Sequence, residues 1–294
     1  MINNRPLILV LLATLFWAGN AIAGKIAVGH VSPFLLTSLR WLVALLVLLP
    51  FALETLKNDW QKIRPKLVLL FALGTIGFAL FNNLMYLALT ATSAINVAII
   101  QSSMPLFVFI LNLIFFAVRV NKFQAIGFPI TMVGVLAITF QGSVLLLLEQ
   151  SFNVGDVLML LAVVTYSVYS VFLSKKPNIH WLSTMTVLAS AAFVSSLPFT
   201  AYEGVSGKLN LPDLIGMSVV LYTAIFASIG AQAFWIRSIE LIGANATSVY
   251  INLVPIFGAL FAVFLLDEQL HLFHVVGFGL IAVGISVGQI KTQV

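Results

Sequence analysis

Polar side chains that could bind a small molecule lie inside long hydrophobic stretches of this sequence. Trp17 and Asn20 are three residues apart, so an α-helix would place them on one face. Arg40 lies about two turns into the next hydrophobic stretch, where an unpaired cation costs from ~3 kcal/mol upward. It is therefore a candidate for contact with a substrate carboxylate. The alternative is a structural arginine paired with backbone carbonyls or a neighbouring amide.

Further amides, hydroxyls and aromatic rings fall at related places in the two halves of the chain. Asn83 and Tyr86 share a helical face, and Gln232 and Trp235 share one 149 residues later. This pattern suits a ligand with polar ends and an apolar or aromatic body. Ordinary helix packing and interfacial aromatic belts are the alternative explanation. The candidate substrate-binding residues are Trp17, Asn20, Arg40, Asn83, Tyr86, Ser102, Tyr166, Tyr169, Gln232, Trp235, Tyr250 and Asn252.

The elements that must position these residues are membrane-spanning helices, each of ~20 apolar residues. Of the 294 residues, 61% are hydrophobic and 8% charged, and the mean hydropathy is +1.13. This excludes an ordinary soluble enzyme and a nucleic-acid-binding domain, despite the net charge of +5. With no cysteine, disulfides and cysteine-based metal sites are excluded. The sequence predicts an all-α integral membrane protein of ten transmembrane helices, at residues 6–28, 33–53, 67–89, 93–116, 123–141, 155–173, 182–202, 214–236, 244–266 and 272–290.

Lysine and arginine are unevenly distributed between the connections, which predicts the orientation. One face has three acids and eleven cations, which are Arg5, Lys57, Lys62, Arg64, Lys66, Arg119, Lys122, Lys175, Lys176, Arg237 and Lys291. The other face has only two cations, Lys25 and Lys208, and six acids. We therefore expect the basic face and both termini to be cytoplasmic, in a bacterial-type inner membrane.

The second half of the chain repeats the first at a shift of 150 residues, which aligns Pro105 with Pro255 and Gly134 with Gly284. Five helices is an odd number, so the halves would cross the membrane in opposite directions. We expect residues 1–145 and 153–294 to form two inverted five-helix repeats, an architecture of secondary transporters. Pro105 and Pro255 are candidate hinges or static kinks. Glycine stripes predict that the helices at 123–141 and 272–290 pack together, or else form a dimer surface.

Two short motifs of the first half are Phe16-Trp17-Ala18-Gly19-Asn20 and Pro33…Arg40. They resemble the W-G-x-N element and the P-x6-R helix of the EamA-type branch of the drug/metabolite transporter superfamily. The first half departs from the family pattern at Ala117-Val118-Arg119, where Gly-Glu is common. The resemblance implies ten helices, two EamA-like repeats, and export or exchange of small metabolites, often amino acids. Further matching segments are Tyr86-Leu87-Ala88-Leu89, Thr92-Ser93-Ala94, Pro105, Gly243-Ala244…Pro255 and Asp267-Glu268.

The predicted function is transport of small metabolites, foremost export of amino acids (aromatic ones included) or related solutes, by alternating access. No Asp, Glu or His lies in the middle of a predicted helix, which favours a facilitator or a weakly coupled carrier. Asp156 is the alternative site for proton exchange. Other candidates are a proton-coupled antiporter of drugs or of nucleotide-sugar or phosphate metabolites, and, in another class, a non-transporting membrane scaffold or receptor.

We expect no enzymatic activity, because the predicted helices contain no nucleophile–base set or carboxylate pair. No cofactor and no metal are expected, since Glu268, His271 and His274 are too loosely spaced for a strong metal signal. The expected partners are a small-molecule solute and the lipid bilayer, with no nucleic acid. A monomer is expected, with a dimer as the alternative.

If Arg40 contacts a substrate carboxylate, the change Arg40→Gln removes the cation and raises the apparent KM for carboxylate substrates. Flux into proteoliposomes measures this, with the amount of folded protein as the control. Unchanged transport kinetics would reject direct contact.

Overall fold

The computed structural model describes residues 5–143, 153–266 and 271–290, and every regular element within these ranges is helical. Helices satisfy all backbone polar groups within one segment, as hydrocarbon requires. The first half contains α1 (Arg5–Ile26), α2 (Pro33–Ile63), α3 (Leu67–Leu73), α4 (Phe81–Ala91), α5 (Ala94–Gln101), α6 (Met104–Phe116) and α7 (Lys122–Thr139). The second half contains α9 (Val154–Phe172), α10 (Trp181–Val205), α11 (Leu214–Tyr222), α12 (Ala231–Val249), α13 (Val254–Leu266) and α14 (Leu272–Gly288).

Seven helical stretches in the described residues are long and apolar enough to cross a membrane. Two are much longer than one crossing needs: Pro33–Ala91 has 59 residues and Leu214–Phe261 has 48. The apolar helix α14 has 17 residues. Helix α2 ends at Ile63 rather than at the predicted residue 53. The added turns are rich in charged side chains, so the apolar stretch stops at residue 53. The helix itself continues for ten more residues.

Two segments of π-helix interrupt long helical stretches at related places in the two halves. Segment η2 (Gly74–Leu80) joins α3 to α4, and η4 (Thr223–Gly230) joins α11 to α12. They begin 149 residues apart, the same shift that relates the aromatic and amide positions above. π-Helices are rare and concentrate at functional sites. The two halves therefore share an unusual backbone feature as well as their hydrophobic pattern.

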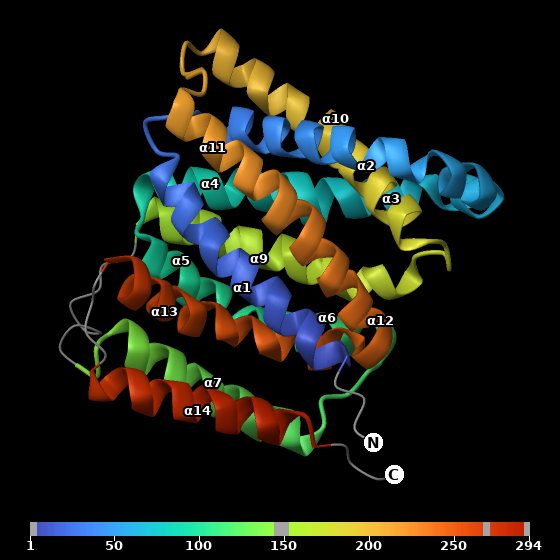
Figure 1. Cartoon of the computed structure of the whole chain (residues 1–294). Helices are drawn as coiled ribbons and strands as arrows, with labels where there is room; N and C mark the ends of the chain where they lie inside the picture. The colour runs from blue at the N-terminus through green and yellow to red at the C-terminus, as the bar shows by residue number, and fades with distance from the viewer. Residues whose placement is uncertain (1–4, 144–152, 267–270, 291–294) are drawn as a thin grey trace.

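Helices of one half pack mainly against helices of the other half. Helix α2 lies against α10, α4 against α9, α1 against α12, and α7 against α14 (Figure 1). The start of α1 and the end of α14 lie at the same end of the bundle (Figure 1). Three 3₁₀ turns complete the structure: η1 (Arg64–Lys66), η3 (Leu173–Lys175) and η5 (Tyr250–Leu253).

The predicted packing of the glycine stripes is confirmed by α7 and α14. A Cβ atom added at Gly284 would lie 2.6 Å from the backbone oxygen of Gly127, and one added at Gly134 would lie 2.8 Å from the backbone oxygen of Gly277. Only glycine allows two helix backbones to approach so closely. This contact joins the last helix that the structure describes in the first half to the last that it describes in the second.

The change Gly284→Ala is therefore expected to lower the free energy of unfolding by about 1–3 kcal/mol, because the methyl group forces the two backbones apart. Thermal denaturation in detergent measures the loss. Gly279→Ala is the matched control on the same helix, since a Cβ atom there meets nothing within 4 Å. Equal melting temperatures of the two variants would contradict the close contact.

Candidate functional site

A small cavity lies between helices of the two halves. It leaves about 10 Å³ for the centre of a water molecule, which is room for roughly one water. The cavity is thus too small for a metabolite, which would fit only after helices or side chains move. The lining comes from α1, α4, α5, α6 and α9, through Trp17, Asn20, Ala21, Phe81, Met85, Gln101, Met104, Val163 and Tyr166.

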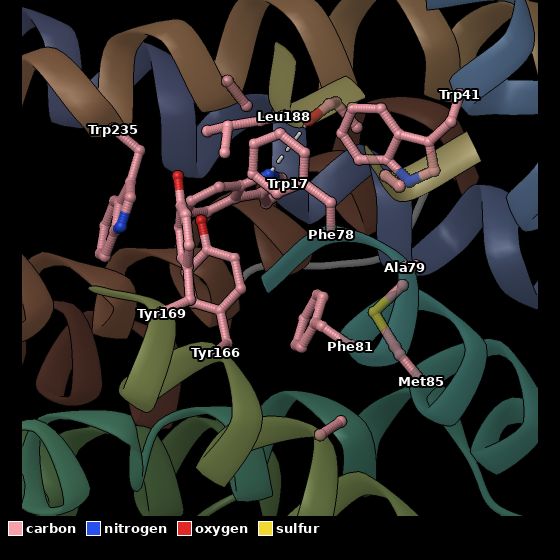
Figure 2. Packing of buried hydrophobic residues seen from close by; sticks show 14 of the residues in the cluster. Trp17, Trp41, Phe78, Ala79, Phe81, Met85, Tyr166, Tyr169, Leu188 and Trp235 are labelled. Atoms are coloured by element: carbon pink, nitrogen blue, oxygen red, sulfur yellow. Dashed lines mark hydrogen bonds between the residues drawn. The ribbon is translucent and has the colours of Figure 1, made fainter. Parts of the chain in front are cut away.

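Aromatic rings form one wall of the cavity and the layer behind it. The ring of Trp17 meets the ring of Tyr166 edge-on at 5.7 Å between centroids, and Trp235 at 4.9 Å. Tyr166 also contacts Phe81 at 4.8 Å and Tyr169 at 5.1 Å. Figure 2 shows these rings converging from different helices. Trp17, from the first half, thus lies against Tyr166, the residue 149 positions later in the second half.

The polar atoms of Trp17, Tyr166 and Trp235 are bonded away from the cavity, which fixes these rings, whereas the buried hydroxyl of Tyr169 has no partner among the described residues. Trp17 Nε1 donates to the backbone oxygen of Ala227 in η4 at 3.3 Å. The hydroxyl of Tyr166 donates to Gln232 Oε1 at 2.9 Å. Trp235 Nε1 donates to Ser170 Oγ at 3.3 Å. The rings therefore offer the cavity apolar faces and edges rather than hydrogen bonds.

Arg40 lies one side chain away from the cavity and is 2% exposed. None of the three ion pairs among the described residues includes it. All of its contacts are with neutral groups, as expected for an arginine with a structural role. Its Nε donates to Ser228 Oγ at 2.8 Å, its Nη2 to the backbone oxygen of Thr223 at 3.3 Å, and its Nη1 to Asn82 Oδ1 at 3.1 Å, Asn20 Oδ1 at 3.3 Å and the Tyr86 hydroxyl.

Not all predicted site residues lie at the cavity. Asn252 donates to Thr131 on α7 at 2.7 Å, and Tyr250 packs in a separate cluster with residues of α7 and α14. Both residues lie in the 3₁₀ turn η5, and their side chains point toward α7. Ser102 bonds back to the oxygen of Ala98 at 2.9 Å. Asn83 is buried, and neither of its amide atoms has a partner in the described part of the chain.

Six of the nine residues that line the cavity lie outside the predicted set, and the position of one of them, Gln101, gives a signal. Gln101 is 8% exposed, lines the cavity, and forms no side-chain hydrogen bond among the residues that the structure describes. It ends α5, just before the break that precedes Pro105. A polar residue at a helix break in an apolar stretch could have identified it. Met85 and Met104 carry no such signal, because methionine is ordinary in any hydrophobic core.

The two candidate hinges occupy matching positions. Pro105 is the second residue of α6 and Pro255 is the second residue of α13. Each follows an interruption of the helix, at Ser102–Ser103 and at η5. Proline is favoured at a helix start because its missing N–H needs no partner there.

Polar contacts hold the connections together at one end of the bundle. His30 Nδ1 lies 2.7 Å from Asp213 Oδ2, and the backbone N–H of Asp213 donates to the oxygen of His30 at 3.3 Å. A hydrogen bond from the backbone N–H of Gly216, then the contact with His30, lower the pKa of Asp213. Glu203 accepts from Ser32 Oγ at 2.8 Å and from the N–H of Leu35 at 3.0 Å. The loop after α1 is thus tied to the end of α10 and the start of α11.

A second set of contacts holds the other end. Asp59 near the end of α2 accepts from the N–H of His180 at 2.8 Å. Glu240 pairs with Lys176 at 2.7 Å and with Arg237 at 2.8 Å. Polar contacts therefore join neighbouring elements at both ends of the bundle.

Asp156 lies apart from the cavity lining and is 2% exposed. It accepts from Thr92 Oγ1 at 2.6 Å and Asn96 Nδ2 at 3.1 Å. Of the weak metal candidates, His271 and His274 form the capping box that begins α14, and Glu268 lies outside the described residues.

Residues 4–140 and residues 153–287 each match the EamA-like transporter family. The chain belongs to this family. It is 29% identical to the uncharacterized transporter YyaM of Bacillus subtilis, over 95% of this chain and 91% of that protein. It is 25% identical to a protein of Salmonella typhimurium named "Probable amino-acid metabolite efflux pump", over 95% and 93% of the two chains. A solved crystal structure shares the fold, with a TM-score of 0.74, 17% identity and 96% of each chain covered.

Proposed function

We propose that this EamA-family protein exports amino acids, aromatic ones included, or related small solutes by alternating access. The observation that carries the proposal is the small cavity between the two halves. Its walls combine the rings of Trp17 and Tyr166 with the amides of Asn20 and Gln101. Such a site matches the apolar body and polar ends of an amino acid. The name of the Salmonella relative supports the same class of solute.

We infer ten membrane crossings from the lengths of the helical stretches. A straight helix of 59 residues would be about 90 Å long, roughly three times the hydrocarbon thickness. This stretch passes through the basic turn Arg64–Lys66, and the stretch of 48 residues has a non-helical Gly243 at φ 80°. Five of the seven stretches would cross once, each of the two long stretches would cross twice, and α14 would add one crossing, which gives ten. An even number agrees with the shared end of α1 and α14 (Figure 1).

We propose that residues 1–145 and 153–294 are inverted repeats. The double family match supports this division, as do the two π-helices at a shift of 149. The capping boxes of α7 and α14 begin at Asn121 and His271, 150 residues apart. Five crossings in each half would turn the second half over relative to the first. The cavity would then lie at the interface of the repeats, where such carriers bind their solutes.

The proposed mechanism is uncoupled or weakly coupled. No acidic side chain lines the cavity in the described part of the chain, and Asp156 lies apart from it. The end of the bundle that carries Lys62, Lys176 and Arg237 would be cytoplasmic by its positive charge, in a bacterial-type inner membrane. Both termini would lie on that side.

Purified protein in liposomes is expected to carry amino acids with saturable kinetics, and an imposed pH gradient is expected to leave the flux unchanged. Uptake of a radiolabelled amino-acid panel measures both. Flux that follows the gradient would contradict the uncoupled mechanism and direct attention to Asp156. Absence of flux for every amino acid would contradict the proposed substrate class.

Alternating access is expected to open the contact between the loop after α1 and the start of α11 in each cycle. The backbone nitrogen of Asp213 lies 3.3 Å from the backbone oxygen of His30, so the two backbones approach closely enough for a disulfide to be tested here. The double change His30→Cys and Asp213→Cys, in a chain that has no cysteine, is expected to stop flux on oxidation and to regain it on reduction. Each single variant under the same oxidation is the control. Full flux through completely cross-linked protein would rule out opening at this end.

A further inference from the structure

We propose that the solute's carboxylate binds the amide hydrogens of Asn20, and that Arg40 is a positioning residue acting through this amide. The proposal rests on the proposed transport of amino acids, and it identifies the atoms that select the solute. It also replaces direct contact between Arg40 and the carboxylate by an indirect one.

The orientation of the Asn20 amide follows from its partners. A guanidinium group has donors only, so the amide atom that faces it must be the oxygen. Asn20 Oδ1 lies 3.3 Å from Arg40 Nη1 and accepts from the hydroxyl of Tyr86 at 2.9 Å. The oxygen therefore has two donors, and the NH₂ group is left for other partners.

The amide hydrogens have no strong acceptor in this structure. Asn20 Nδ2 has one contact among the described residues, with the thioether sulfur of Met85 at 4.0 Å. A thioether is a weak acceptor. Asn20 is 4% exposed and both residues line the cavity, so the free hydrogen-bonding capacity belongs to the cavity. An acceptor atom on a solute would give the buried NH₂ group of Asn20 the strong hydrogen-bond partner that it lacks.

The charge behind the amide favours an anionic acceptor. Arg40 is buried among neutral acceptors, and the three ion pairs of the described residues join other side chains. A cation without a counter-ion keeps its field in a low-dielectric interior. Through the bond to Oδ1, it also polarises the amide and strengthens Nδ2 as a donor. A carboxylate at Nδ2 would supply the missing negative charge.

The rest of the cavity suits the remainder of an amino acid. The amide of Gln101, which has no partner among the described residues, can accept from an ammonium group, and the faces of Trp17 and Tyr166 can hold an apolar or aromatic side chain. The described cavity lining contains no charged side chain. One arginine behind one amide provides a single positive charge, which suits a carboxylate with one negative charge better than a phosphate with more than one.

Three probes test the preference for a carboxylate in detergent-purified full-length protein. They are L-phenylalanine, 3-phenylpropionate, which lacks the ammonium group, and 2-phenylethylamine, which lacks the carboxylate. Isothermal titration is expected to give both carboxylates about 10- to 100-fold higher affinity than the amine, the range of a charge-assisted hydrogen bond. Equal or tighter binding of the amine, or no binding of either carboxylate, would overturn the proposal.

The change Asn20→Asp is the sharpest variant, because the new carboxylate can pair with Arg40 and so retains the fold. It removes the amide hydrogens and neutralises the cation. The affinity for both carboxylates is expected to fall about 10- to 100-fold, and the preference over the amine to be lost or reversed. Asn112→Asp is the matched control, a buried amide bonded to Asn245 between α6 and α12, outside the cavity lining. It is expected to leave all three affinities within about threefold.

The change Asn20→Ala separates indirect from direct recognition. It keeps the charge of Arg40 and removes only the amide, so carboxylate affinity is expected to fall about 10-fold. Unchanged affinity would mean that Arg40 reaches the carboxylate itself, which overturns the proposal. Flux in proteoliposomes is measured in parallel with the wild-type chain. If the protein binds carboxylates selectively but carries no flux, the proposed transport is wrong and this inference stands. If it carries flux without preferring carboxylates, this inference is wrong and the proposed transport stands.

Discussion

An arginine buried in an apolar helix bundle must have its N–H groups paired, and the interior of this protein is arranged around that requirement. Arg40 on α2 reaches α1, α4 and η4 with one side chain. One of its acceptors is the backbone oxygen of Thr223, the first residue of η4. The hydrogen-bond pattern changes where an α-helix becomes a π-helix, which leaves carbonyls available to side chains. Trp17 uses a second carbonyl of η4, and Asn82 uses that of Phe78 in η2. The π-helices and the buried donors therefore depend on each other.

A second pairing ties α2 to α10 at both ends. Glu203, near the end of α10, accepts from N–H groups at the start of α2, and Asp59, near the end of α2, accepts from the N–H at the start of α10. A carboxylate at a helix start is favoured by the helix dipole as well as by the hydrogen bonds. Because the two helices cap each other, they are expected to move as one body. Pro105 and Pro255, which follow helix interruptions outside this pair, remain the predicted hinges.

The sequence predicts those parts of the structure that follow from hydrophobicity and residue size. Apolar stretches become helices because hydrocarbon leaves the backbone no alternative, and small residues on two of these helices allow the contact between Gly127 and Gly284. Trp17, Asn20 and Tyr166 could be identified from the sequence because each carries a polar group, and a polar group without a hydrogen-bond partner is unfavourable inside an apolar helix bundle. The π-helices were not identifiable, since Gly74–Leu80 has the composition of any apolar helix. The direction in which the Asn252 side chain points could not be predicted either, because it depends on how the turn η5 rotates the chain.

Placing the cation one amide away from the cavity has a consequence for a carrier. A carboxylate in direct contact with a buried guanidinium would be held strongly, because attraction between charges rises as the distance and the dielectric constant fall. A carrier must also release its solute on the far side, so such a contact would slow each cycle. An amide between the two charges lengthens their separation and still aligns a donor with the carboxylate. Arg40 can then remain bonded to Ser228, Asn82 and Thr223 while solutes come and go, so the interior that it organises need not be rebuilt in each cycle.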